Sequence, residues 1–288
     1  MKRVCPVCQT SESILIFHDH NRREWYDELE GDYVQCNSCG MHYLTNIPSF
    51  DEMGGKYEDI YVELNIDWQK KKLKHWVSFN DKRIIDIGCN HGTQLIPYYN
   101  AGWDVYGIDL NKKAIDDCKK YLPENHFSVS TIEDSTFLEN YFDKIQTFHV
   151  LEHVYSPIDF LRKCHNLLGK DGELEIRIPH GKSLEMRVCW KYSSQSWVPF
   201  HINMFDKKTI TQILQSAGFS SISVHTNPIP WWWILSFRQY IWTINMRRGE
   251  TNFHQNIFHK LLQWVLLIPL WIISRFGLGE ELHIFAKK

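Results

Sequence analysis

The sequence predicts an α/β protein with a seven-stranded, mostly parallel sheet, helices on both faces, and a small zinc-binding module at its N-terminus. Two observations support this prediction. From residue 81 onward, short apolar strands alternate with helical segments, which is the pattern of βαβ units. Before residue 45 the chain is polar and carries two Cys-x-x-Cys pairs. Because this part has too few apolar residues for a core, a metal ion is expected to stabilise it.

Length and composition narrow the class of protein. The chain has 288 residues, 43% of them apolar, which is enough for one large domain with an appendage. Its net charge is −2, so no strong basic field draws it to nucleic acid. Residues 1–13 have no apolar run of the kind found in secretory signal peptides. We therefore expect a cytoplasmic protein, in which cysteines bind metal or pack as small apolar side chains.

Three segments are expected along the chain. Residues 1–45 are predicted to form the zinc ribbon, residues 46–80 an aromatic and helical linker, and residues 81–288 the α/β domain. Within that domain, residues from about 228 to 276 interrupt the alternation of strands and helices. They are apolar, rich in tryptophan and basic, and we interpret them as an insertion.

The four N-terminal cysteines have the spacing of a tetrahedral zinc site. The two Cys-x-x-Cys pairs are separated by 27 residues, as in zinc ribbons with four cysteine ligands. Gly40 follows the second pair and allows a tight turn in which backbone amides can point at the thiolates. A site closed by four thiolates has no open position, so the zinc is expected to be structural. A redox dithiol and an iron–sulfur centre are the alternatives. The predicted ligands are Cys5, Cys8, Cys36 and Cys39.

The α/β part is predicted to contain seven strands joined by helices. Gly102 is expected to end a helix over 93–101, and Asn111 and Asp206 are expected N-cap residues of later helices. The last strand returns from the apolar insertion, so we expect it to be the antiparallel edge strand of a mixed sheet. The predicted strands occupy residues 83–87, 104–108, 127–130, 144–149, 173–178, 221–225 and 281–286.

A glycine-rich turn after the first of these strands indicates a cofactor site. It contains Asp86, Gly88 and Gly92, and glycine lets the backbone approach a ligand closely. The turn departs from the G-x-G-x-x-G pattern of dinucleotide sites, and the acid at its start suits a cationic ligand better than a phosphate. Asp109 ends the next strand, 23 residues later, where a carboxylate accepts both ribose hydroxyls. Together these features favour S-adenosylmethionine over NAD.

Three motifs give the chain a family resemblance. They are Asp86-Ile-Gly-Cys-Asn-His-Gly-Thr93, Gly107-Ile-Asp109 and His149-Val-Leu-Glu-His-Val154. Through them the chain resembles the class I S-adenosylmethionine-dependent methyltransferases, and most of all the ubiquinone-biosynthesis-like branch, over about residues 81–225 and 279–287. The resemblance implies a Rossmann-like fold. The G-C-N-H-G-T variant and the four cysteines also resemble the zinc-containing sugar C-methyltransferases, which are usually longer and have a second C-terminal domain.

The resemblance implies a set of cofactor contacts. Its motifs fall at the ends of successive strands, where ligands of open α/β sheets bind. The residues it implies are Asp86, Gly88 and Gly92 for the methionine part, Asp109 for the ribose, Ile132 and Glu133 for the adenine, and His149 near the methyl group.

Candidates for catalysis follow the fourth and fifth strands of the predicted sheet. Methyl transfer requires orientation of the acceptor and, for an alcohol or a carbon acid, a base. Glu152 and His153 follow the fourth strand, and His201 and Asn203 lie in the loop after the fifth. We take His153 as the first candidate for the base and His201 as the second. The alternative is that His153 only forms hydrogen bonds within its own loop.

The apolar stretch at 229–276 has two interpretations. Its longer apolar run, at 261–273, is short of the roughly 20 residues that span a bilayer. Tryptophan and arginine beside apolar helices are typical of a segment that lies in the membrane interface. The alternative is a pair of helices that packs on the sheet or forms a homodimer.

These observations predict a cytoplasmic, S-adenosylmethionine-dependent methyltransferase with a structural zinc ion. It would act on oxygen or carbon of a small molecule, a glycan or a lipid-linked intermediate, and the apolar stretch would place it at the inner face of the membrane. An RNA methyltransferase is one alternative, although the segment starting at His149 differs from the Asn/Asp-Pro-Pro-aromatic motif suited to a base amino group. A cofactor-binding scaffold without catalysis is the other.

Overall fold

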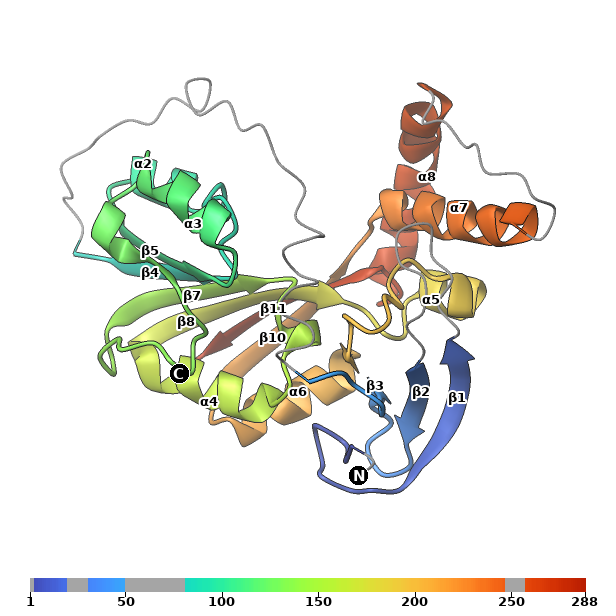
Figure 1. The fold of residues 1–288 in the computed structure, drawn as a ribbon. Coiled ribbons are helices and arrows are strands. Elements are labelled where there is room, and N and C mark those ends of the chain that lie inside the picture. Colours follow the sequence, from blue (N-terminus) through green and yellow to red (C-terminus); the bar gives the residue numbers. More distant parts are fainter. Residues whose placement is uncertain (1–2, 20–30, 50–80, 247–256) are drawn as a thin grey trace.

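The computed structural model describes residues 3–19, 31–49, 81–246 and 257–288, which form a seven-stranded sheet flanked by helices and a smaller four-stranded sheet (Figure 1). The predicted linker at 46–80 lies almost entirely outside the described residues. The smaller sheet contains the N-terminal segment and packs below the carboxyl end of the large one. At the same end, two long helices project away from the body of the protein.

The large sheet has the order β10-β11-β8-β7-β4-β5-β6. All of its neighbouring strands are parallel except those that pair with β11. The prediction that the last strand is antiparallel is confirmed, but the prediction that it lies at the edge is wrong. It runs between β8 and β10, because its side chains are mostly buried whereas those of β10 are at least partly exposed and suit the edge. The strands are β4 (Arg83–Ile87), β5 (Asp104–Asp109), β6 (Phe127–Val129), β7 (Phe142–Phe148), β8 (Leu168–Pro179), β10 (Ser220–Asn227) and β11 (Glu281–Lys287).

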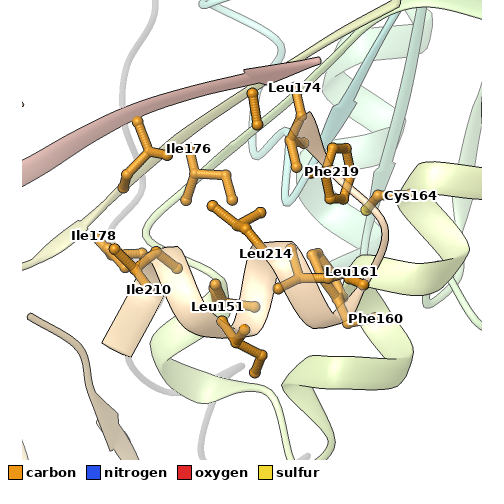
Figure 2. Packing of buried hydrophobic residues seen from close by; sticks show 14 of the residues in the cluster. Leu151, Phe160, Leu161, Cys164, Leu174, Ile176, Ile178, Ile210, Leu214 and Phe219 are labelled. Atoms are coloured by element: carbon orange, nitrogen blue, oxygen red, sulfur yellow. The ribbon is translucent and has the colours of Figure 1, made fainter. Parts of the chain in front are cut away.

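Helices cover both faces of this sheet. Helices α2 (Ile96–Asn100) and α3 (Lys112–Lys119) lie over β4 and β5, and α4 (Pro157–Leu167) and α6 (Lys207–Ser216) lie on the opposite face. Figure 2 shows how the second pair forms the main core. The apolar side chains that meet there, between the two helices and β8, include Phe160, Leu161, Cys164, Leu174, Ile176, Ile210 and Leu214.

The predicted caps explain where the helices begin. The Asn111 side chain accepts a hydrogen bond from the Ala114 amide, and Asp206 forms a reciprocal capping box with Thr209. The first helix begins at Ile96 rather than at 93, because the residues before it form turns of the glycine-rich segment. The described residues also contain three short 3-10 turns: Glu124–His126, Leu151–His153 and Trp190–Tyr192.

The smaller sheet joins the N-terminal segment to the α/β domain. Its strands are β1 (Ser13–Asp19), β2 (Gly31–Cys36), β3 (His42–Leu44) and β9 (Asn203–Met204). The last of these belongs to the loop between β8 and α6, and it pairs antiparallel with β3. The cysteine-rich segment is therefore packed directly on the α/β domain, because a strand of that domain completes its sheet.

The apolar insertion forms two helices, α7 (Pro230–Met246) and α8 (Ile257–Arg275), and a shorter helix, α5 (Leu184–Cys189), lies beside α7. One side of α8 is buried through Leu270 and Ser274. Among the described residues, no helix is both long and apolar enough to cross a membrane. The other side of α8 and the turn after it nevertheless expose large apolar side chains: Val265 (69%), Ile268 (69%), Trp271 (49%), Ile272 (49%) and Phe276 (78%).

Candidate active site and metal centre

The glycine-rich turn lies at the carboxyl end of β4. Gly88 and Gly92 have φ angles of 76° and 68°, a region that glycine adopts without strain. A Cβ atom at Gly88 would stand 2.3 Å from the side chain of Val150, so a larger residue would clash. The amides of Gly88 and Cys89 both donate to the carbonyl of Ile108. The neighbouring strand β5 thus fixes the turn where the sequence predicts the cofactor.

Asp109 connects this turn to the next helix. One carboxylate oxygen accepts the Asn90 amide at 2.8 Å, and the other accepts the Asn111 amide at 2.8 Å. A carboxylate offers about four lone-pair sites, so two remain for hydroxyl donors. This partly exposed carboxylate can therefore hold the turn in place and still accept the hydroxyls of a ribose.

The other residues predicted to contact the cofactor differ in exposure. Asp86 is buried on β4, and burial raises the pKa of its carboxyl to about 7. A cationic ligand group beside it would favour the ionised form, as expected for the methionine part of the cofactor. Beyond β6, Ile132 is buried and Glu133 is exposed. In an adenine pocket, the buried Ile132 would be suited to the wall and the exposed Glu133 to the rim.

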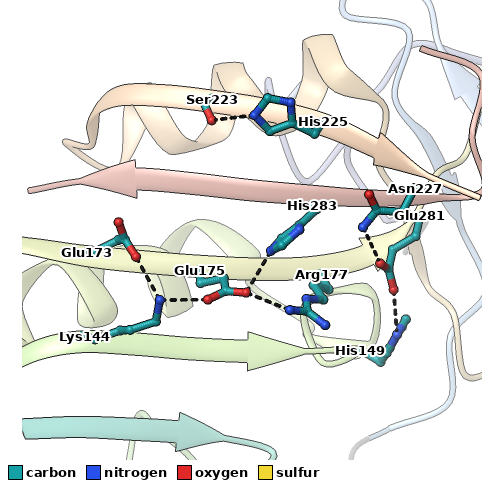
Figure 3. A network of polar contacts seen from close by, with 10 residues as sticks. All are labelled: Lys144, His149, Glu173, Glu175, Arg177, Ser223, His225, Asn227, Glu281 and His283. Carbon is teal, nitrogen blue, oxygen red and sulfur yellow. Dashed lines mark hydrogen bonds and ion pairs between the residues drawn. The ribbon is translucent and has the colours of Figure 1, made fainter. Parts of the chain in front are cut away.

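His149 follows β7 and is held between two glutamates. Its backbone has a φ of 57°, which is uncommon for a residue other than glycine. Its Nδ1 lies 3.4 Å from Glu152 Oε1. Its Nε2 lies 3.3 Å from Glu281 Oε1, a contact shown in Figure 3. Burial opposes a charge on the ring, but the two carboxylates outweigh it and raise the pKa of His149 to about 10. The ring is therefore an imidazolium at neutral pH, and the ring of Trp232 meets it edge-on.

The three predicted catalytic residues form one cluster. Glu152 is 1% exposed, and neither of its carboxylate oxygens has a hydrogen-bond partner in the described part of the chain. Its Oε1 lies 4.0 Å from His153 Nε2. The rings of His153 and His201 are 4.9 Å apart, and one ligand atom from each of the three residues lies within 4.8 Å of the others. The structure thus brings together residues that are up to 49 positions apart in the sequence.

Hydrogen bonds to backbone carbonyls fix the tautomers of both histidines. His153 Nδ1 is 2.8 Å from the Phe200 carbonyl, and His201 Nδ1 is 2.6 Å from the Gln195 carbonyl. A carbonyl oxygen only accepts, so Nδ1 carries the proton in each ring, and Nε2 carries the lone pair when the ring is neutral. Burial, together with the nearby His153, lowers the pKa of His201 to about 3. His201 is therefore neutral over the whole physiological range.

The N-terminal segment holds the loop that carries His201. Arg3 donates to the Ile202 carbonyl at 2.9 Å and to the Asn203 side chain at 2.8 Å. Asn203 in turn donates to the carbonyls of Leu151 at 3.2 Å and Val154 at 2.7 Å, on either side of His153. The two loops that supply the cluster are thus tied to each other and to the cysteine-rich segment.

The four N-terminal cysteines converge as predicted. Cys5 and Cys39 have their sulfur atoms 3.5 Å apart, and Cys8 and Cys36 have theirs 3.4 Å apart. All four sulfur atoms lie within 4.8 Å of one another. Tetrahedral coordination at a Zn–S distance of about 2.3 Å would place the sulfur atoms about 3.8 Å apart. The thiol set therefore fits one zinc ion.

Three residues that complete the site were not identified from the sequence. Arg3 and Trp232 reach the site only through long-range packing, and no motif in their local sequence indicates that they belong to it. Glu281 could have been found, because the first residue of an antiparallel strand lies at the edge where the parallel strands end. Glu281 also accepts a hydrogen bond from Asn227, and so it joins β10, β11 and β7 at this edge (Figure 3).

The order of the strands, the glycine-rich turn and the acid that ends β5 define a class I, Rossmann-like methyltransferase fold. The protein family described as "Methyltransferase domain" matches residues 66–224. The chain therefore belongs to this family, and it is an S-adenosylmethionine-dependent methyltransferase.

Curated relatives align with most of this chain. A ubiquinone biosynthesis O-methyltransferase of Roseobacter denitrificans is 27% identical over 234 residues, covering 75% of this chain and 86% of the relative. A protein with the same name from Cereibacter sphaeroides is 26% identical, covering 71% and 81% of the two chains. The prediction of a methyltransferase similar to this branch is confirmed.

Solved structures support the fold. A SAM-dependent methyltransferase from Archaeoglobus fulgidus matches with a TM-score of 0.50 and 18% identity, covering 83% of this chain and all of the other. The [4+2]-cyclase SpnF matches with a TM-score of 0.51 and 14% identity, covering 84% and 97% of the two chains. At this identity the likeness concerns the fold alone, so the acceptor must be argued from the site.

Proposed function

We propose that the protein methylates a hydroxyl group of a small, lipid-linked acceptor at a membrane surface. The observation that carries this proposal is the cluster of Glu152, His153 and His201, at the same edge of the sheet as the glycine-rich turn. A histidine of fixed tautomer at that edge is suited to take a hydroxyl proton. The names of the relatives, which are O-methyltransferases, favour oxygen over carbon as the acceptor atom.

In this proposal the cofactor would be held by the turn. Asp86, Gly88 and Gly92 would contact its methionine part, Asp109 its ribose, and Ile132 and Glu133 its adenine. When bound, S-adenosylmethionine supplies a methyl group on a positively charged sulfur. His149 and Glu281 would close the methionine end, because their ion pair joins β7 to β11 beside the turn.

His153 would act as the general base. Its Nδ1 is occupied by the Phe200 carbonyl, so Nε2 would take the proton of the acceptor hydroxyl as the oxygen bonds to the methyl carbon and the carbon–sulfur bond breaks. Buried Glu152, 4.0 Å away, would stabilise the imidazolium that forms. Neutral His201 would position the acceptor, or replace His153 as the base.

The zinc ion would be structural. Four thiolates would fill its coordination sphere, which leaves no position for a substrate. Its role would be to hold β1, β2 and β3 together, and through β9 and Arg3 to position the loop that carries His201. The chain would thus consist of the ribbon at 1–45, the linker at 46–80 and the methyltransferase domain at 81–288.

The exposed apolar side of α8 supports contact with a membrane. Val265, Ile268 and Ile272 recur at helical spacing on this side, and contiguous apolar surface of this kind marks an interaction site. Arg275 lies over the ring of Trp271, with 4.6 Å between the guanidinium carbon and the ring centroid. This pair is suited to the headgroup region. Trp231–Trp233 also belong to the stretch that the sequence predicts to contact the membrane, but Trp233 donates to Glu280 and Trp232 contacts His149. We therefore propose that α8, rather than these tryptophans, contacts the membrane.

Methyl transfer can be measured with radiolabelled S-adenosylmethionine and a catechol that carries a farnesyl chain, presented in anionic vesicles. We expect an O-methylated product from the prenylated catechol and a much slower reaction with catechol itself. A product methylated on carbon, or methylation of RNA alone, would contradict the proposal. Binding of S-adenosylhomocysteine with no turnover on any of these acceptors would favour a non-catalytic scaffold.

Membrane contact can be tested separately by sedimentation with vesicles of anionic phospholipid. The variant Val265→Ser/Ile268→Ser should stay in the supernatant while the wild-type protein sediments, because it removes apolar surface from the exposed side. Val129→Ser, an exposed valine on β6, is the matched control. If the wild-type protein remains in the supernatant as a dimer, and the double variant is monomeric, this surface is a homodimer interface instead.

A further inference from the structure

A cavity of about 270 Å³ lies between the smaller sheet and α5, away from the glycine-rich turn. Its floor is one face of the sheet, where alternation along neighbouring strands places Phe17, Tyr33 and His42 on the same side. Its opposite wall comes from the segment after β8 and includes Lys182 and Trp190. Because the ribbon supplies one wall and the α/β domain the other, neither part has this cavity by itself.

Three aromatic rings contribute to the apolar lining of the cavity. The ring of Phe17 lies 5.0 Å from that of Tyr33 and 5.7 Å from that of Trp190, measured between centroids. Trp190 stands at the mouth and is 45% exposed. Aromatic faces arranged in this way stack on flat or sugar rings.

The polar part of the cavity favours an anion. No acidic side chain is among the lining residues in the described part of the chain. Lys182 is ion-paired with Asp206. Arg187 is exposed, and within the described part of the chain the one hydrogen bond of its side chain is from Nε to the Lys182 carbonyl, at 3.1 Å. Among the described residues its two terminal nitrogens make no further hydrogen bond or ion pair, and a guanidinium binds phosphate through two parallel hydrogen bonds.

Two further donors from the lining residues, Lys182 and Gln35, lie near each other. A Cβ atom placed on Gly40 would lie 3.5 Å from Lys182 Nζ and 3.7 Å from Gln35 Nε2, so these two nitrogens converge. Burial, and then the charge of Lys182, lower the pKa of His42 to about 4. His42 is therefore neutral at physiological pH, and its ring adds one donor and one acceptor to this end of the cavity.

We propose that this cavity is a second ligand site, which binds a small phosphorylated ring compound such as a nucleoside monophosphate or a sugar phosphate. The ring would lie against Phe17 and Trp190, and the phosphate would be bound by Arg187 together with Lys182 and Gln35. The cavity volume suits a small ligand of this class, since sites for drug-sized ligands have about 300–1,000 Å³. The site is separate from the cofactor, because none of the residues predicted to bind the cofactor lines it.

The cavity also borders the proposed catalytic cluster. Tyr33 on its floor donates to the carbonyl of His201, and Ser196 on its wall follows Gln195, whose carbonyl accepts from His201 Nδ1. A ligand in the cavity would therefore contact residues that hold His201 from two sides. The proposal itself concerns binding, and it does not depend on which acceptor is methylated.

Calorimetry on the full-length, zinc-loaded protein tests this proposal, with S-adenosylhomocysteine at saturation so that the cofactor site is filled. The probes are uridine 5′-monophosphate, glucose 1-phosphate and, as the neutral control, uridine. We expect at least one phosphorylated probe to bind with a Kd below about 1 mM, and uridine to bind at least about tenfold more weakly. The phosphorylated probe that binds more tightly shows whether the site prefers a nucleoside or a sugar ring.

Two variants locate the binding. Arg187→Gln should weaken binding of the phosphorylated probe at least about tenfold, and Trp190→Ala should weaken it by a similar factor. Arg162→Gln, an exposed arginine on α4, is the matched control and should bind like the wild-type protein. The absence of binding of both phosphorylated probes at concentrations up to about 10 mM would overturn the proposal. Equal binding by wild type and Arg187→Gln, with both folded by circular dichroism, would overturn it as well.

Discussion

The two halves of the proposed site are built in different ways. The cofactor half, residues 81–135, takes its turn, its acid and its supporting strands from one short stretch of chain, and Asp109 closes it through the amides of Asn90 and Asn111. The proposed acceptor half combines residues 3–19, 31–49, 149–205, 228–246 and 257–281, which meet only in the folded protein. Its histidines are fixed by carbonyls of a loop that the cysteine-rich segment holds through Arg3.

The cofactor half would thus be a local unit that depends on one stretch of chain, whereas the acceptor half would depend on several segments that are far apart in the sequence. A local turn between two buried strands depends on few other segments, so changes elsewhere should leave it intact. The acceptor half depends on a proposed metal site about 150 residues away from the histidines that it helps to position. Variants that damage one half and spare the other therefore test the comparison directly.

The largest effect is expected from removal of the zinc ligand Cys36. Structural zinc sites contribute about 10 kcal/mol or more of apparent binding free energy to the folding of small modules. Cys36→Ser should therefore lose its zinc, unfold β1–β3 and abolish turnover, while S-adenosylhomocysteine binding stays within about twofold of wild type. Elemental analysis and calorimetry measure the two results. Cys189→Ser, outside the cluster, should keep the metal; full zinc occupancy in Cys36→Ser would contradict the assignment.

The next largest effect is expected at the proposed base. His153→Ala should lower kcat by about 10²–10⁴-fold, the usual contribution of a general base, with cofactor affinity nearly unchanged. Steady-state kinetics with calorimetry on the same preparation separates the two quantities. His225→Ala, an exposed histidine on β10, should behave as wild type. Normal turnover by His153→Ala would transfer the role to His201 or to no base at all.

A smaller effect is expected on the cofactor side. Asp109→Asn keeps the shape of the side chain but removes the charge that would accept the ribose hydroxyls. It should weaken S-adenosylhomocysteine binding by about 2 kcal/mol, roughly 30-fold. The zinc content and the secondary structure should remain those of the wild type, which is the converse of the Cys36 variant. Unchanged affinity would show that other groups hold the ribose.

The smallest effect is a change in the pH dependence of stability. The folded pKa of His149, about 10, lies above the ordinary value of 6.5. The stabilisation from its ion pairs is therefore full below about pH 6.5, and it declines as the pH rises toward 10. Urea unfolding between about pH 6.5 and pH 9.5 should show a shallower decline for His149→Gln than for wild type. Identical slopes would mean that the ring is not charged in the folded protein.

The sequence by itself determined the local features of this protein. The glycine-rich turn, Asp109, the caps at Asn111 and Asp206 and the convergence of the four cysteines all follow from patterns that span a few residues, or from a spacing with one chemical meaning. Even the antiparallel last strand could be predicted, since a strand that returns from an insertion can add to a parallel sheet in that direction.

Only the tertiary structure decided where these parts meet. It placed the last strand inside the sheet rather than at its edge, paired β3 with β9, and brought Arg3, Trp232 and Glu281 to the histidines. Each of these contacts joins segments far apart in the chain. Their formation depends on how whole surfaces pack together, and such packing leaves no periodic pattern in the residues on either side of the contact.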